Sequence, residues 1–247
     1  MTERPMLMSA PMVRGTLADQ KTQTQRVIKI PYLEFRGAGG KTGADWNDPR
    51  CWGQEDAYGD EWALSDGPGV DRVFRCRYGV AGDRLWLKET WQFADWTDDG
   101  YPYIRYRADG ETRLIERGIP ESWSERLEGI WADLSCDANY EIDNRAADRR
   151  WRPAIYMPRW ASRILLEITD VRVQRLWEIS EEDAHAEGVQ FDASIDPQSS
   201  DACAPVVLAD SARDHFQALW NSINAARGFG WDSNPWVWAI TFKRVMP

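Results

Sequence analysis

Apolar positions near the start of the chain predict a strand followed directly by a helix. Residues 6–8 form a short apolar run typical of a buried strand. Ser9 and the nearby Pro11 mark a helix start, and apolar residues at helical spacing extend this helix from about residue 10 to residue 19. A further strand is predicted over residues 27–30.

Alternation predicts strands in the middle of the chain, over residues 84–91 and 103–107. In the first of these, Leu85, Leu87 and Glu89 fall on one face. Glu89 therefore shares a face with aliphatic residues, so it is either paired inside the protein or located at a strand end.

The second half of the chain predicts long strands and two capped helices. Residues 164–173 carry the longest strand signal, and the side on which apolar residues fall switches near residues 169–170, as at a bulge or bend. Helices are predicted over 180–188 and 211–227, each with a serine N-cap and a terminal glycine. Residues 236–242 are apolar on both faces, which is typical of a central strand.

Two stretches interrupt these regular patterns, at about residues 34–69 and 109–150. The first is rich in Gly, Asp and Pro and has no helical or strand period. The second contains apolar residues at helical spacing over 123–134. It could be a lid or partner surface, or an insertion that packs on the body of the protein, and we favour the packed insertion.

Composition narrows the possible ligands. The formal net charge of -10 disfavours strong nonspecific binding to DNA or RNA, so a nucleoside or a single flipped-out base is the easier partner. The 15 tryptophans must be core residues, pocket walls or stacking surfaces for a base.

Cysteine spacing predicts no zinc site, because no two of the four cysteines form a C-x-x-C pair and the chain has two histidines. There is neither a signal-peptide pattern nor an apolar run of about 18 residues. We therefore expect a cytoplasmic protein with reduced thiols, no metal, no cofactor and no membrane contact.

Candidate chemistry is concentrated in residues 21–26. If a helical turn persists there, Lys21 and Thr24 share a face, and the amine could reach the hydroxyl as a base beside a nucleophile. The alternative is that Lys21 and Arg26 are solvated cations near the negative end of a helix dipole. Glu187, in the last turn of another helix, is either a buried general acid or base or a solvated glutamate.

Taken in order, several motifs resemble the ASCH domains of the PUA-like superfamily. They are Lys21-x-x-Thr24-x-Arg26, Gly82-Asp83-x-Leu85-x-Leu87, the helix at 179–188 and the terminal strand. Large prophage-type members also carry stretches similar to residues 82–86 and 157–163. The family often has a glycine two residues before the lysine, where this chain has Asp19.

The resemblance implies an α+β fold, a small β-barrel with flanking helices and a cleft that takes a nucleobase. It covers most of the chain apart from the two irregular stretches, and it implies a single domain over residues 1–247 with those stretches as insertions. Small bacterial members are N4-acetylcytidine amidohydrolases that use a lysine, a threonine and a glutamate. Their motif positions fall on Lys21, Thr24 and Glu187, which we expect to converge beside the strand at 84–91.

The leading hypothesis is therefore a metal-independent amidohydrolase acting on an N-acylated pyrimidine nucleoside such as N4-acetylcytidine. Lys21 would be the base, Thr24 the nucleophile or water-positioning group, and Glu187 the acid. The alternatives are a non-catalytic reader of modified bases in RNA or DNA, and a ribonuclease. The expected substrate-binding residues are Arg26, Trp86, Glu89, Arg159 and Trp160.

Overall fold

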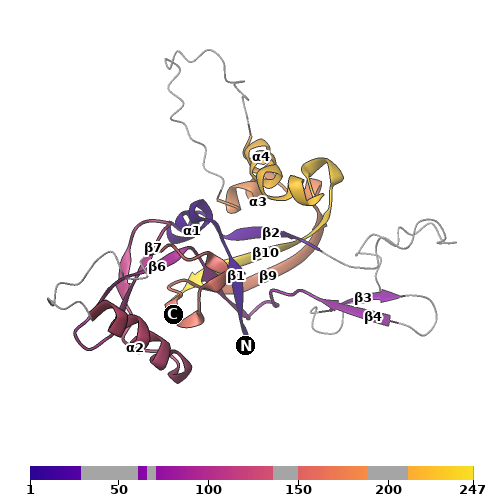
Figure 1. Ribbon diagram of the computed structural model, residues 1–247. Helices are drawn as coiled ribbons and strands as arrows, with labels where there is room; N and C mark the ends of the chain where they lie inside the picture. Colours follow the sequence, from indigo (N-terminus) through magenta and orange to yellow (C-terminus); the bar gives the residue numbers. More distant parts are fainter. Residues whose placement is uncertain (29–60, 66–70, 136–149, 189–210, 247) are drawn as a thin grey trace, which may run out of the picture. The chain divides into compact units, whose positions relative to one another are not determined.

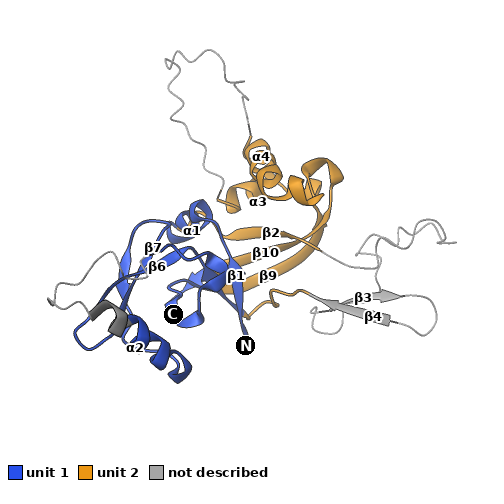
Figure 2. Cartoon of the chain, in the orientation of Figure 1, with its two compact units in different colours: residues 1–18, 84–166, 244–247 blue, residues 19–83, 167–243 orange. Residues whose placement is uncertain are grey.

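The computed structural model describes residues 1–28, 61–65, 71–135, 150–188 and 211–246. The chain divides into two compact units, each built from separate segments (Figure 2). Unit 1 comprises residues 1–18, 84–166 and 244–247, and unit 2 comprises residues 19–83 and 167–243. Most of the predicted irregular stretch at 34–69 lies outside the described residues, as do three of the four cysteines. The remaining cysteine, Cys76, is buried with a free thiol.

Unit 1 begins with the predicted strand and helix. Strand β1 (Glu3–Leu7) pairs in parallel with β5 (Arg84–Lys88), so that Glu3 lies opposite Arg84. Helix α1 (Ala10–Leu17) has a proline in its first turn, where the missing N–H costs no hydrogen bond. The guanidinium of Arg14 on this helix donates to the Ala108 carbonyl at 2.8 Å.

A second sheet of unit 1 is antiparallel and carries a helix. Its strands are β6 (Trp91–Trp96), β7 (Pro102–Tyr106) and β8 (Thr112–Leu114). Helix α2 (Glu121–Ser135) lies beside this sheet (Figure 1). Its contacts with the core come from Trp123, Leu127 and Ile130. The apolar spacing over 123–134 therefore does mark a helix, and this helix packs against the sheet. The predicted strand at 84–91 is wrong at its end, since β5 stops at Lys88 and Trp91 begins β6.

In unit 2, β9 (Leu165–Arg175) is followed in sheet order by β10 (Trp236–Val245) and β2 (Gln23–Val27). The first two residues of β9 and the last two of β10 belong to unit 1. β10 and β2 are antiparallel, with Ala239 opposite Gln25. Strands β3 (Glu61–Ser65) and β4 (Asp71–Arg75) form a separate antiparallel pair. The expectation of irregular structure is therefore wrong for residues 61–65, and β2 begins earlier than the predicted strand at 27–30.

Helices α3 (Glu181–Ala186) and α4 (Ala212–Asn224) close the core of unit 2. Their starts follow the sequence signals, because the hydroxyls of Ser180 and Ser211 accept the backbone N–H three residues later, at 3.0 and 3.2 Å. The buried residues of this core come from α3, α4 and nearby segments: Leu176, Ile179, Ala184, Ala212, Phe216, Trp220, Trp231 and Val237.

The protein is thus a mixed α+β fold with several sheets, linked in part by short 3-10 turns. These turns are Ala154–Tyr156, Arg159–Ala161, Leu176–Glu178, Ala225–Arg227 and Trp231–Ser233. Among the described strands no closed barrel is found, so the expected PUA-like barrel remains a proposal. No helix in the described ranges is both long and apolar enough to cross a membrane.

Candidate functional site

Lys21 and Glu187, 166 residues apart in sequence, lie side by side in unit 2. Their backbones form an antiparallel bridge, and the Thr22 N–H donates to the Ala186 carbonyl at 2.8 Å. Gly188 makes this approach possible. Its φ is +74°, and a Cβ at this position would lie 2.8 Å from the Cβ of Lys21.

The side chains of Lys21 and Glu187 form a buried ion pair, with residue exposures of 2% and 3%. The Lys21 ammonium donates to a Glu187 carboxylate oxygen and, at 2.9 Å each, to the backbone carbonyls of Gln23 and Glu187. The other carboxylate oxygen accepts the backbone N–H of Gln25. All three ammonium protons are therefore engaged. The ion pair also hydrogen-bonds to two backbone groups of the strand at residues 23–27, the Gln23 carbonyl and the Gln25 N–H.

The surroundings of this pair lower the pKa of the Lys21 amine below the value of a lysine in water. Burial lowers the pKa of Lys21, the Glu187 carboxylate opposes this, and the Arg26 charge lowers the pKa further. Burial and the Arg26 charge therefore shift the pKa of Lys21 in the direction that a lysine base requires, whereas the carboxylate opposes that shift.

Thr24 is buried close by in sequence, but in a different geometry from the one predicted. The helix ends at Leu17, Asp19 takes a φ of +56°, and Thr24 lies in strand β2. Alternation along the strand places the Thr24 and Arg26 side chains on the face opposite Gln23 and Gln25. The expected shared helical face is wrong, and in the described part of the chain the Thr24 hydroxyl makes no hydrogen bond to the ion pair.

Asp19 has a left-handed backbone conformation, and it stands where motifs of the ASCH type often carry glycine. A positive φ suits glycine best, and Asp and Asn are the residues that adopt it next most readily. The turn between α1 and β2 can therefore form without the glycine.

Two buried glutamines, Gln23 and Gln25, flank the ion pair, and no role was predicted for them from the sequence. Gln23 Oε1 accepts from Arg172 Nη2 and Thr241 Oγ1, at 3.2 Å each. Neither the oxygen nor the nitrogen of the Gln25 carboxamide has a hydrogen-bond partner in the described part of the chain, although both atoms are buried. Once the segment is recognised as a strand, alternation from Gln23 would have identified Gln25.

The other predicted binding residues belong to unit 1. Trp86 is half-buried, and the Lys88 ammonium lies 5.3 Å from its ring centroid. Arg159 pairs with Glu3, its Nε lying 2.8 Å from a carboxylate oxygen. Trp160 is buried in the core of this unit, with its indole edge-to-face against Trp123 at a centroid distance of 5.2 Å.

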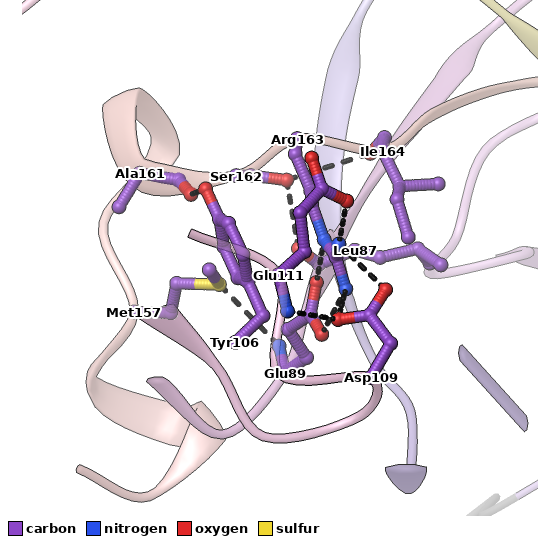
Figure 3. A network of polar contacts seen from close by, with 10 residues as sticks. All are labelled: Leu87, Glu89, Tyr106, Asp109, Glu111, Met157, Ala161, Ser162, Arg163 and Ile164. Carbon is purple, nitrogen blue, oxygen red and sulfur yellow. Dashed lines mark hydrogen bonds and ion pairs between the residues drawn. The ribbon is translucent and has the colours of Figure 1, made fainter. Parts of the chain in front are cut away.

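Glu89 is held in unit 1 by Arg163, which the sequence analysis did not single out (Figure 3). Arg163 Nε and Nη2 donate to the two Glu89 carboxylate oxygens at 2.9 and 3.0 Å. Glu89 directly follows β5, so it lies at a strand end and is also paired inside the protein. Burial raises the pKa of Glu89, and the hydrogen bonds from Arg163 oppose this rise.

The same guanidinium connects further segments of unit 1 (Figure 3). It donates to Asp109 at 2.8 and 3.1 Å and to Glu111 at 2.5 Å, and it lies 4.1 Å from the ring centroid of Tyr106. The Tyr106 hydroxyl in turn donates to the Ala161 carbonyl at 2.9 Å. These contacts give Glu89 a structural role, with both oxygens occupied by Arg163.

Within the described residues, no group of three or more His, Cys, Asp or Glu side chains is arranged to hold a metal ion. Comparison with known proteins gives no assignment, because no family model, curated protein or solved structure matches the chain.

Proposed function

We propose that this protein is a metal-independent amidohydrolase that removes the acyl group from an N-acylated pyrimidine nucleoside such as N4-acetylcytidine. The observation that carries the proposal is the contact between Lys21 and Glu187. The ASCH resemblance requires this pair to converge, and 166 residues separate the two positions. The PUA-like barrel with a nucleobase cleft belongs to the same proposal.

The buried pair contains the two proton-transfer groups that amide hydrolysis needs. Moving one proton from the Lys21 ammonium to the Glu187 carboxylate would produce a neutral amine and a carboxylic acid together. The amine would then take a proton from Thr24 or from a water that Thr24 positions, as oxygen adds to the acyl carbon. Glu187 would give its proton to the leaving nitrogen, releasing the deacylated nucleoside and, after hydrolysis of any acyl-enzyme, the carboxylic acid.

Gln25 supports a base as the ligand rather than the chemistry at the acyl group, because its side chain lies on the strand face opposite Thr24. Within the part of the chain that the structure describes, its buried carboxamide has both an unpaired donor and an unpaired acceptor, the two groups that a glutamine uses to read the polar edge of a base. Leaving such a group unpaired costs free energy, and a ligand that supplies both partners would recover it.

The test is incubation of the full chain with N4-acetylcytidine and chromatographic measurement of cytidine release. Lys21→Ala and Glu187→Gln should abolish the release, whereas Thr24→Ser should retain more of it than Thr24→Ala. A rate no greater than that of Lys21→Ala, with N4-acetylcytidine and with close N4-acyl analogues, would refute the proposal.

A second candidate, a non-catalytic reader of a modified base, is favoured by one feature of the pair. All three Lys21 ammonium protons are engaged and Thr24 makes no hydrogen bond to the pair, so the ion pair could act only as a structural element. This candidate predicts oligonucleotide binding that weakens as salt rises, without turnover. Binding of nucleosides with no gain from a longer strand would count against it.

A further inference from the structure

Unit 1 contains a cavity of about 700 Å³, and neither Lys21 nor Glu187 is among the residues that line it. It lies among β8, the loop that follows β8, the start of α2 and the 3-10 turn at Arg159–Ala161. Its volume is within the range of about 300–1,000 Å³ that is typical of small-molecule sites.

One side of the cavity is aromatic. Trp123 and Trp160 both line it, and Trp160 is anchored by a second edge-to-face contact with Trp91 at 6.3 Å. Trp160 is 9% exposed, and its indole N–H has no hydrogen-bond partner in the described part of the chain. A buried indole donor without a partner is suited to a ligand that brings an acceptor against this wall.

The rim of the cavity is cationic. Arg113, Arg117 and Arg159 line it together with Glu3 and Glu116. Arg159 is paired with Glu3, whereas Arg113 and Arg117 are exposed and form no ion pair within the described residues. In a chain with a net charge of -10, this is a local positive excess beside an aromatic wall.

We propose that this cavity binds a nucleotide, with the base against Trp123 and Trp160 and the phosphate on Arg113 and Arg117. Guanidinium groups bind phosphate through charge-assisted hydrogen bonds, and tryptophan packs against the flat, apolar surface of a base. A free nucleotide and the end of a single strand present the same groups, and the titration described next distinguishes the two sources. The proposal is independent of amide hydrolysis in unit 2.

Calorimetric titration of the full chain tests the assignment with AMP, ribose 5-phosphate and a 5′-phosphorylated thymidine pentanucleotide as probes. AMP should bind at least about fivefold more tightly than ribose 5-phosphate, because stacking of a base contributes roughly 1–3 kcal/mol. Tighter binding of the pentanucleotide than of AMP identifies a nucleic-acid end as the source, and equal binding identifies free nucleotides.

Two exposed arginines provide the decisive variant. The double variant Arg113→Gln, Arg117→Gln should weaken AMP binding by at least about tenfold, because each substitution removes a charged hydrogen bond to the phosphate. Arg227→Gln, which changes an exposed arginine of unit 2, should leave the affinity unchanged. The proposal is overturned if neither AMP nor the pentanucleotide binds, if ribose 5-phosphate binds as well as AMP, or if the double variant binds normally.

Discussion

Replacing Arg163 with methionine should lower the free energy of unfolding by about 3–5 kcal/mol. Most of this loss comes from Glu89, because the two side chains are 3% and 2% exposed and the substitution leaves a buried carboxylate without its partner. Asp109 and Glu111 are 28% and 56% exposed, so solvent screens their pairs, which contribute about 0–1 kcal/mol each.

Urea unfolding followed by circular dichroism measures this loss, and two variants test its cause. Adding Glu89→Leu to Arg163→Met should recover much of the stability, because the double variant no longer buries an unpaired charge. Arg105→Met, which removes an exposed arginine bonded to Thr112 at 3.3 Å, should change stability by no more than about 0.5 kcal/mol. A loss below about 1 kcal/mol for Arg163→Met, or a double variant no more stable than the single one, would refute the reasoning.

Two further predictions concern the contact between Lys21 and Glu187. Gly188→Ala should destabilise unit 2 by at least about 1 kcal/mol more than Gly228→Ala, because both glycines have positive φ but only at Gly188 would a Cβ meet Lys21; equal losses in urea unfolding would contradict this. The lowered pKa of Lys21 means that, between its folded pKa and its ordinary value of 10.5, the unfolded chain binds more protons, so this residue makes stability rise with pH. The stability difference between wild type and Lys21→Met should shift in favour of wild type across that alkaline window, and a difference independent of pH would show that the pKa is not lowered.

Local signals were sufficient to predict the elements whose cause is itself local. Ser180 and Gly188 mark the ends of α3 because a cap and a left-handed residue depend only on neighbouring residues. Residues 21–26 were harder, since this short segment is compatible with a helical turn and with a strand. Pairing with β10 decides in favour of the strand, and that pairing is long-range.

The contacts that build the candidate sites were less accessible to pattern analysis. Arg163 lies in a largely apolar stretch, and its partners Glu89, Asp109 and Glu111 come from two other segments. Neither spacing nor charge along the chain relates these positions. The contact of Lys21 with Glu187 was expected only through the ASCH resemblance, because the residues alone left Glu187 open as a solvated side chain.

The hydrogen bonds between the ion pair and the backbone of β2 also affect the tendency of the protein to aggregate at high concentration. β2 is an edge strand among the described strands of its sheet. An edge strand normally presents free N–H and C=O groups to which a strand of another molecule can add, and this is a common route to aggregation. Here the Lys21 ammonium holds the Gln23 carbonyl and the Glu187 carboxylate holds the Gln25 N–H. The pair thereby blocks this part of the strand against self-association, so a variant that opens it should be more prone to form fibrils.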